Sequence, residues 1–458
     1  MDTAPTVTTD GPLLSGIPLS YNQEFLCGFD RGDEEGPFGP HNHIVHGWRL
    51  RGRVDGPTLR LALGDLVVRH ETLRTRIIRH GPQQTQEVFP AVLPDLAVRD
   101  EPGLTADARE RRVEELLNEV EAGELPVGRL PLLRALLVTF DADDALLILV
   151  VHHTATDGWS VRVLARDLAG RYAARRGHPG HELPPASPYR EYAQWQRSLP
   201  AESAGPARDY WRAELRDARI FAVPADRPKS AGLPESTAVH RFLIGAELVA
   251  PALQVARASR STPFMVLLAA FTLLANRMTG DTDVVVPTFS PGRADERFTY
   301  TVGPFFNLLP LRTRLADCRT FLDVVARVRR SCLDGYGHDL PFPQIAAEAP
   351  ELMLPVLRDD AAACVFQVFP FPFVLDDERV GDLVWTEMRR RLVSQPVGSD
   401  VPNGALWTLN LDPVGDIVGS VQYNSNLYDE RTVAAMVRGY REVLAEVVPA
   451  ADAPLRLA

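Results

Sequence analysis

The sequence predicts an α/β (α+β) protein made of two lobes. Its 458 residues exceed the usual size of one domain, which favours two hydrophobic cores. Helical and strand patterns alternate in both halves of the chain. Residues 177–188 are dense in glycine and proline and are typical of a linker. We therefore expect a flexible tail at residues 1–15, a first lobe at 16–180 and a second lobe at 181–458.

The elements of the first half follow from the spacing of apolar residues. Residues 57–70 and 106–122 carry apolar side chains at helical spacing, and both predict helices. Residues 145–151 (ALLILVV) form a continuous apolar run that suits a buried strand. A third helical pattern follows, with one apolar face formed by Val161, Leu164, Leu168 and Tyr172. The residues between this strand and this helix are thus predicted to be a loop at a strand end, where rigid scaffolds often present functional groups.

The second half repeats the alternation of helices and strands. Its predicted helices are residues 263–277, 320–333 and 432–447. Its predicted strands are residues 283–289 and 417–423. A further buried strand is indicated by aromatic residues that mostly alternate, namely Phe366, Phe369, Phe371 and Phe373.

Composition excludes several classes of function. With 49 Lys+Arg against 60 Asp+Glu, the net charge is −11, which disfavours binding to nucleic acid or to an anionic membrane. The longest apolar stretch, residues 264–275, is shorter than the roughly 18 residues of a membrane span. The first thirty residues carry no lysine or arginine, so they do not resemble a signal peptide. We expect a cytoplasmic protein with no nucleic-acid or membrane partner.

Cysteine and histidine spacing argues against a metal site. The four cysteines lie far apart without a CxxC pair, so we expect reduced thiols, and Cys27 and Cys364 are predicted to be inert. His41, His43 and His46 form an H-x-H-x-x-H pattern. On a strand, His46 would point away from the other two, so ordinary polar positions or a place along a substrate channel are the better interpretations.

The strongest chemical signal is the loop at residues 152–158 (HHTATDG). His153, preceded by His152, can accept a proton near neutral pH and act as a general base. Asp157 can anchor the loop by pairing with an arginine, or can orient the imidazole. Gly158 leaves space for a substrate to approach the backbone. The alternative is a buried polar loop without a catalytic role.

This loop resembles the HHxxxDG motif of the condensation domains of nonribosomal peptide synthetases. Five further stretches resemble motifs of that family in the family's order: residues 20–23 (SYNQ), 69–75 (RHETLRT), 189–196 (YREYAQWQ), 302–307 (VGPFFN) and 338–342 (HDLPF). The last family motif is only partly kept, because residues 360–364 replace its middle. The resemblance spans residues 17–445, nearly the whole chain.

The resemblance implies a V-shaped pseudodimer of two chloramphenicol-acetyltransferase-like lobes with a central tunnel. It assigns His153, with His152 beside it, to the catalytic group as base or as positioner of the nucleophile. Asp157 would be structural and paired with Arg69. Gly158 would line the tunnel beside the thioester.

Two supporting residues complete the implied site. Trp159 continues the histidine motif, and Asn307 would lie on the facing lobe.

The function implied by the resemblance is acyl transfer. The enzyme would take an acyl or aminoacyl group from the phosphopantetheine thioester of a carrier protein and pass it to an alcohol or amine, with no bound cofactor of its own. We expect a free-standing condensation enzyme, and residues 16–32 resemble members that join β-amino acyl groups to enediyne antibiotics. Docking of an acidic carrier would need a basic patch, for which residues 327–330 and 389–391 are candidates.

Three alternatives remain open. A coenzyme A-dependent O- or N-acyltransferase shares the fold, although its plant members carry a DFGWG motif that is missing from this sequence. A non-catalytic docking module tends to lose the second histidine or the glycine, and both are kept. An epimerase of the same superfamily is disfavoured by Trp159 following Gly158.

Overall fold

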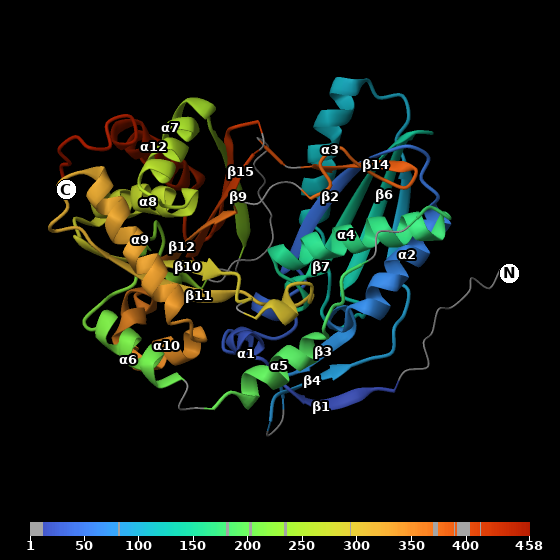
Figure 1. Cartoon of the computed structure of the whole chain (residues 1–458), viewed down its shortest axis with the longest axis horizontal. Coiled ribbons are helices and arrows are strands. Elements are labelled where there is room, and N and C mark those ends of the chain that lie inside the picture. Colours follow the sequence, from blue (N-terminus) through green and yellow to red (C-terminus); the bar gives the residue numbers. More distant parts are fainter. Residues whose placement is uncertain are drawn as a thin grey trace.

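The computed structural model describes residues 12–80, 83–179, 183–200, 204–232, 236–293, 295–369, 374–388, 390–391, 404–412 and 414–458. They form two lobes that lie side by side, meet at one end and diverge at the other, as Figure 1 shows. This arrangement agrees with the predicted two-lobe α/β architecture. The loop at residues 152–158, called the histidine loop below, belongs to the first lobe, on the right in Figure 1.

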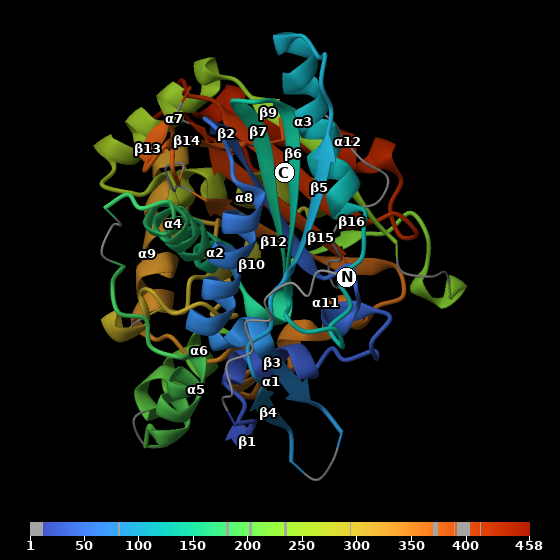
Figure 2. The ribbon, with the colours of Figure 1, turned by 90° about the vertical axis from the view of Figure 1, so that its right-hand side faces the viewer.

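The first lobe is built on a six-stranded sheet. Its strands lie in the order β13 (Glu378–Val380), β14 (Leu383–Met388), β2 (His43–Arg51), β7 (Asp144–His152), β6 (Leu133–Asp141) and β5 (Asp95–Asp100). All neighbours are antiparallel except β5 and β6. The strands run nearly upright in the side view of Figure 2.

Helices cover both faces of this sheet. Helices α2 (Gly56–Arg69) and α4 (Gly158–Arg175) pack with Leu147 and Leu149 of β7 in one core. Helix α3 (Ala106–Glu121) packs with Leu146 and Ile148 of the same strand in another. Because both faces are covered, residues 145–151 of β7 are apolar at every position rather than at alternate ones, which explains the continuous run in the sequence.

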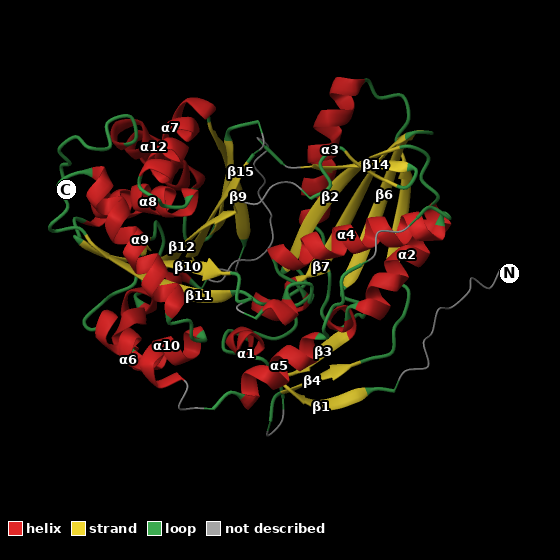
Figure 3. Cartoon of the chain, in the orientation of Figure 1, coloured by secondary structure: helices red, strands yellow, loops and turns green. Residues whose placement is uncertain are grey.

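The second lobe, on the left in Figure 3, repeats this plan around a five-stranded sheet. Its strands lie in the order β8 (Ala222–Pro224), β12 (Ala361–Phe369), β15 (Gly404–Leu411), β16 (Ile417–Asn424) and β9 (Thr237–Ile244). Strands β10 (Asp283–Ser290) and β11 (Asn307–Arg314) form a separate antiparallel pair. The helices of this lobe are α7 (Ala246–Ala258), α8 (Pro263–Thr279), α9 (Phe321–Gly337), α11 (Leu354–Leu357) and α12 (Glu430–Val447).

Helix α8 is the centre of the second core. Thr262 caps it by accepting a hydrogen bond from the backbone nitrogen of Met265 at 3.3 Å, and Gly280 ends it in a left-handed conformation (φ 76°). Every residue from 265 to 276 is buried, and all of them except Thr272 and Asn276 are apolar. Among the described residues no single helix is long and apolar enough to cross a membrane. Helices α7 and α8 reach that length only together and are bent by 111°.

Short elements join the lobes where they meet. A three-stranded sheet of β1 (Leu14–Pro18), β4 (Thr85–Val88) and β3 (Thr75–Ile78) lies at the base of Figure 1. Beside it lie α1 (Tyr21–Cys27) and α5 (Tyr189–Ser198), whereas α6 (Gly205–Glu214) and α10 (Phe342–Glu348) pack on the core of the second lobe. Helix α1 of the first lobe contacts α10 of the second.

One segment of the predicted second lobe lies in the first. Strand β14, orange in Figure 1, pairs with β2, and Trp385 and Leu383 are buried in the first core. The indole nitrogen of Trp48 donates a hydrogen bond to the carbonyl of Val374 at 3.4 Å. The simple division at residue 181 therefore misses a strand that returns to the first lobe.

The predicted elements are confirmed to within a few residues at their ends, as α2, α3, β7, α4, α8, β10, α9, β16 and α12. The predicted tail at 1–15 overlaps β1, which begins at Leu14, and residues 1–11 lie outside the described part. The alternating aromatic strand is β12 for Phe366 and Phe369, whereas Phe371 and Phe373 lie outside the described residues.

Candidate active site

The histidine loop joins the end of β7 to the start of α4. His153–Ala155 form one turn of 3₁₀-helix, and Asp157 is the residue that caps α4. The Asp157 carboxylate accepts a hydrogen bond from the backbone nitrogen of Ser160 at 2.7 Å. An aspartate suits this place, since it satisfies a free amide and its charge complements the positive end of the helix dipole.

His152 is fully buried and uses both ring nitrogens within the protein. Its Nε2 lies 3.1 Å from the Gly39 carbonyl oxygen, to which it donates, and its Nδ1 accepts from the Thr154 backbone nitrogen at 3.2 Å. Burial lowers the pKa of His152 to about 3, so the ring is neutral. The structure therefore makes His152 a support of the loop. The prediction that groups it with the catalytic residues is corrected, because neither nitrogen is free for a substrate.

His153 is half-buried and has one free nitrogen. Its Nδ1 lies 2.9 Å from the Thr156 carbonyl oxygen. A carbonyl only accepts, so Nδ1 carries the hydrogen and Nε2 carries the lone pair. Among the described residues Nε2 has no hydrogen-bond partner. Burial also lowers the pKa of His153, which keeps the imidazole neutral and able to accept a proton.

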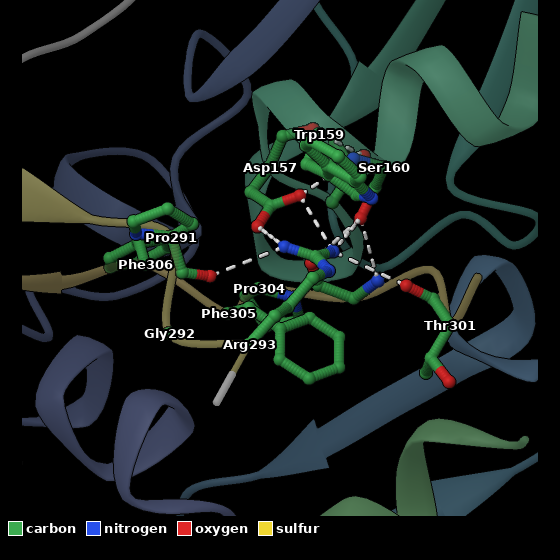
Figure 4. Close-up of polar contacts among 12 residues, drawn as sticks. Asp157, Trp159, Ser160, Pro291, Gly292, Arg293, Thr301, Pro304, Phe305 and Phe306 are labelled. Atoms are coloured by element: carbon green, nitrogen blue, oxygen red, sulfur yellow. Dashed lines mark hydrogen bonds and ion pairs between the residues drawn. The ribbon is translucent and has the colours of Figure 1, made fainter. Parts of the chain in front are cut away.

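Asp157 pairs with Arg293, not with Arg69 as predicted. Arg293 Nη1 lies 2.5 Å from Asp157 Oδ2, and Nη2 lies 3.1 Å from Oδ1. Nη2 also donates to Ser160 Oγ at 2.9 Å and to the Thr301 carbonyl at 3.2 Å, as Figure 4 shows. The side chains of both ion-pair partners are less than a tenth exposed. Arg293 thus ties the second lobe to the histidine loop.

Arg69 has a different partner on the same helix. Its Nε donates to Asp167 Oδ2 at 2.7 Å, and the same oxygen lies 2.8 Å from His70 Nε2. Asp167 comes ten residues after Asp157, about 15 Å further along the axis of α4. Arg69, at the end of α2, lies beside the turn of α4 that contains Asp167 and is too far along the helix to reach Asp157.

Residues in or directly beside four sequence motifs converge on one loop of the second lobe, residues 301–307. The backbone carbonyls of this loop accept the hydrogen bonds. The donors are Thr72 Oγ1 to Val302 (3.0 Å), Ser160 Oγ to Gly303 (3.0 Å), Tyr189 Oη to Pro304 (3.0 Å), and Asn22 Nδ2 to Phe305 (3.2 Å) and to Phe306 (2.6 Å). The motifs thus act together to place this loop against the histidine loop.

Two glycines allow this close approach. A Cβ on Gly303 would lie 2.1 Å from the Tyr189 ring. Gly292 adopts φ +62°, and a Cβ there would lie 1.8 Å from the Phe305 carbonyl oxygen. A larger residue at Gly303 would push the loop away from Tyr189 of α5, and one at Gly292 would displace the Phe305 carbonyl.

Gly158 differs from these two glycines. The atoms nearest to a Cβ added there belong to the Phe369 ring at the end of β12, at 3.5 and 3.7 Å, which are ordinary contacts. The packing of the protein therefore does not require glycine at this position. The gap between Gly158 and the Phe369 ring would hold about one added carbon, and the place of Gly158 beside a substrate stays a prediction.

Trp159 points away from the histidine loop. Its indole nitrogen donates to the Thr299 carbonyl at 2.9 Å. Its ring lines a cavity of about 370 Å³ together with Arg162, Tyr300 and Val374. Trp159 is thus another contact between the lobes.

Asn307 holds a turn rather than facing His153. Its Nδ2 donates to Asp339 Oδ1 at 2.9 Å and to the Leu340 carbonyl at 2.7 Å. Its Oδ1 accepts from the backbone nitrogen of Phe342 at 3.0 Å. This amide is fully used in joining two family motifs, residues 302–307 and 338–342.

The other histidines and cysteines predicted above have roles of their own, although His43 lies opposite His152 in the β2–β7 pairing. His43 is buried with its nitrogens 3.0 and 3.2 Å from the carbonyls of Pro40 and Glu121, and His46 pairs with Glu387 at 3.3 Å. The described ranges contain no group of three or more metal-binding side chains. Burial raises the pKa of the Cys27 thiol to about 11 and that of Cys364 to about 12. Neither thiol is a nucleophile at neutral pH.

The basic stretches proposed for docking are largely used inside the protein. Arg390 and Arg241 both pair with Glu121 of α3, and Arg391 pairs with Asp412 at 2.8 Å and Asp416 at 2.5 Å. These ion pairs connect the first lobe to the second.

In the other stretch, Arg327 lies 3.6 Å from Asp317, and Arg329 donates to the Arg260 carbonyl at 2.9 Å. Arg389 lies outside the described residues.

Arg293 is the main residue that sequence reasoning missed. It follows Pro291-Gly292 in the turn after β10 and belongs to none of the motifs quoted above. Its only signal is its place between strand 283–289 and the 302–307 motif, both of which the sequence did indicate.

Comparison with known proteins identifies the family. The family described as Condensation domain matches residues 40–457. Phosphinothricin tripeptide synthetase PhsC of Streptomyces viridochromogenes is 31% identical over 93% of this chain. The probable non-canonical nonribosomal peptide synthetase CymA of Salinispora arenicola is 35% identical over 95% of this chain. The chain spans only 38% of the length of PhsC and 6% of the length of CymA.

Solved structures agree with this result. SgcC5 of Streptomyces globisporus is 46% identical with a TM-score of 0.92, and the match covers 96% of this chain and 100% of that chain. The X-domain from teicoplanin biosynthesis is 25% identical with a TM-score of 0.75, and 96% of each chain is covered. The first condensation domain of the calcium-dependent antibiotic synthetase shares the fold at 19% identity and a TM-score of 0.74. The predicted chloramphenicol-acetyltransferase-like fold is thereby confirmed, and the chain belongs to the condensation-domain family of nonribosomal peptide synthetases.

Proposed function

We propose that this protein transfers an acyl or aminoacyl group from the phosphopantetheine thioester of a carrier protein to an alcohol or an amine. The observation that carries the proposal is the state of His153. Its Nδ1–H is held by the Thr156 carbonyl, and its unprotonated Nε2 is free in a half-buried position. A base of this kind is what a neutral hydroxyl or amine needs in order to attack a thioester.

The reaction requires one proton to be moved twice. His153 Nε2 accepts the proton of the nucleophile as its oxygen or nitrogen bonds to the thioester carbonyl carbon. The carbon–sulfur bond then breaks, and the imidazolium returns the proton to the departing thiolate. Burial lowers the pKa of His153, whereas the nearby Asp157 carboxylate, which pairs with Arg293, raises it.

The proposal places the thioester arm of the donor beside Gly158. Gly158 follows Asp157 directly and is the first residue of α4. A residue without a side chain lets a narrow arm approach the backbone and bring its carbonyl near His153.

The neighbours support a finer proposal. SgcC5 was solved with 1-(2-naphthyl)-1,2-ethanediol, an alcohol, and residues 16–32 resemble enediyne-pathway condensation enzymes. We extend the proposal to a free-standing enzyme that forms an ester or amide from a β-amino acyl group in natural-product biosynthesis. The X-domain from teicoplanin biosynthesis was solved in complex with OxyB. The test must therefore distinguish acyl transfer by this protein from a non-catalytic role in binding a partner protein.

The test presents acyl-loaded carrier and acyl-coenzyme A side by side to model alcohols and amines, with product masses as the readout. Product from the carrier that His153→Ala abolishes supports the proposal. Product only from coenzyme A would show a coenzyme A-dependent acyltransferase instead. Carrier binding without any product would show a docking module.

A further inference from the structure

His43 is a buried histidine at the start of β2, and it belongs to none of the family motifs quoted above. It is only 2% exposed and lies directly opposite His152 in the pairing of β2 with β7. Its Nδ1 lies 3.0 Å from the Pro40 carbonyl oxygen, and its Nε2 lies 3.2 Å from the Glu121 carbonyl oxygen. The ring therefore joins two backbone segments next to the histidine loop.

The histidine loop rests on the segment that leads into β2. We call residues 37–43 the support segment. The backbone nitrogen of His153 donates a hydrogen bond to the Asn42 carbonyl at 2.8 Å. The ring of His152 donates through Nε2 to the Gly39 carbonyl at 3.1 Å. Both histidines of the loop are thus held by carbonyls of this one segment, and a shift of the segment moves the His153 ring.

The support segment is not held by regular secondary structure. Its residues 39–42 lie between a short 3₁₀-helix (Gly36–Phe38) and the first residue of β2. The Asn42 side chain donates to the Pro37 carbonyl at 2.7 Å. Individual contacts of this kind, among them the contact made by the His43 ring, take the place of a helix or a strand ladder in fixing the segment.

Hydrogen counting decides which contact of His43 is a hydrogen bond. Both partners are carbonyl oxygens, which only accept, and a neutral imidazole has one N–H. Burial lowers the pKa of His43, so the ring is neutral and donates to one carbonyl alone. The contact to Pro40 is the shorter of the two, so we place the hydrogen on Nδ1. This bond lies inside the support segment, and the Pro40 carbonyl also accepts from the Leu125 backbone nitrogen at 2.8 Å.

We infer that His43 is a positioning residue for acyl transfer. Its bond to Pro40 holds the support segment, and the support segment holds the backbone of His153, whose Nε2 receives the proton. A displacement of about 1 Å at a reacting group lowers a rate by about 100-fold, so a contact away from the substrate controls turnover. The effect on transfer rests on the proposed function, whereas the effect on the His153 backbone does not.

The test replaces His43 with three side chains of comparable size. Leucine makes neither bond. The amide nitrogen of asparagine takes about the place of Nδ1 and donates to Pro40, and that of glutamine takes about the place of Nε2 and donates to Glu121. We expect His43→Leu and His43→Gln to lower kcat about 10- to 100-fold, with KM for the acyl-loaded carrier within about twofold. His43→Asn should rescue kcat to within about threefold of wild type.

A second measurement needs no activity. Hydrogen exchange of the His153 backbone amide reports its bond to the Asn42 carbonyl. His43→Leu and His43→Gln should speed this exchange about tenfold, as expected for the loss of about one hydrogen bond, and His43→Asn should leave it unchanged. Exchange of the amides of α8 in the second lobe is the reference for overall stability.

The matched control is His46→Leu. His46 lies on the same strand, but its Nε2 pairs with Glu387 at 3.3 Å and not with the support segment. This change should leave kcat and the exchange of the His153 amide within about twofold of wild type.

The outcomes separate this inference from the proposed function. Faster exchange in His43→Leu and His43→Gln but not in His43→Asn supports the inference, even if no acyl transfer is found. If His43→Leu does not fold, the comparison of His43→Gln with His43→Asn decides. Equal exchange in all variants, an equal change in all three, or faster exchange with wild-type kcat overturns the inference, even if transfer is efficient. Absence of transfer by the wild-type protein refutes the proposed function instead.

Discussion

Removing the Arg293 guanidinium should loosen the histidine loop. In Arg293→Gln, Asp157 would remain an almost buried carboxylate whose described partner is the Ser160 amide. The change also removes the bonds to Ser160 Oγ and to the Thr301 carbonyl. Breaking a buried ion pair on one side costs about 3–5 kcal/mol. Since the Ser160 amide still stabilises the charge, we expect about 3 kcal/mol.

The assay is urea unfolding together with the rate of acyl transfer. A small displacement of a catalytic loop lowers turnover by about 10- to 100-fold, and we expect a loss in that range. Adding Asp157→Asn removes the unpaired charge, so the double variant should be at least about 1 kcal/mol more stable than the sum of the two single changes predicts.

The control is an exposed ion pair. Arg358 lies 2.8 Å from Asp360, with both side chains more than 60% exposed. Arg358→Gln should change the unfolding free energy by less than about 0.5 kcal/mol. If Arg293→Gln is equally harmless in stability and turnover, Arg293 does not hold the loop and our reasoning is wrong.

Four further predictions concern pH, two glycines and the contact between the lobes. Burial lowers the pKa of His152 from 6.5 to about 3, so below pH 6.5 only the unfolded chain binds this proton. Stability should therefore fall as pH decreases, by about 1.4 kcal/mol per pH unit down to the folded pKa, and urea unfolding of His152→Asn should show a shallower slope. Gly158→Ala should leave the free energy of thermal unfolding within about 0.5 kcal/mol of wild type, because the added Cβ meets only ordinary contacts. It should slow acyl transfer, because the Cβ would obstruct the approach proposed for the thioester arm. In Gly303→Ala the added Cβ would lie 2.1 Å from the Tyr189 ring, and the change should cost about 2–3 kcal/mol. Glu121→Gln leaves two arginines without their shared carboxylate and should cost about 3 kcal/mol, measured by urea unfolding.

The sequence was most informative where one local pattern decides the structure. The apolar run of β7 and the helical spacing of α4 depend on nearby residues, and both elements formed as predicted. The loop between them followed from the same reasoning. Its place beside a second lobe could be anticipated only from the resemblance to a family, because the converging hydrogen bonds join residues far apart in the chain.

Pairing between distant residues could not be read from one sequence. Arg69 and Arg293 carry the same side chain, and only the course of α4 decides that the first meets Asp167 and the second Asp157. The return of β14 to the first sheet was also missed. It is a short strand, and its partner β2 lies more than 330 residues earlier in the sequence, since Thr386 pairs with Arg49. No local pattern records such a pairing.

The central claim is that His153 Nε2 is the base of an acyl transfer. It is tested most directly by the single-turnover rate of transfer from an acyl-loaded carrier to an alcohol in the wild-type protein and in His153→Ala. Loss of general-base assistance should slow this step by about 10²–10⁴-fold while unfolding stays close to wild type. A His153→Ala rate within twofold of wild type would contradict the claim.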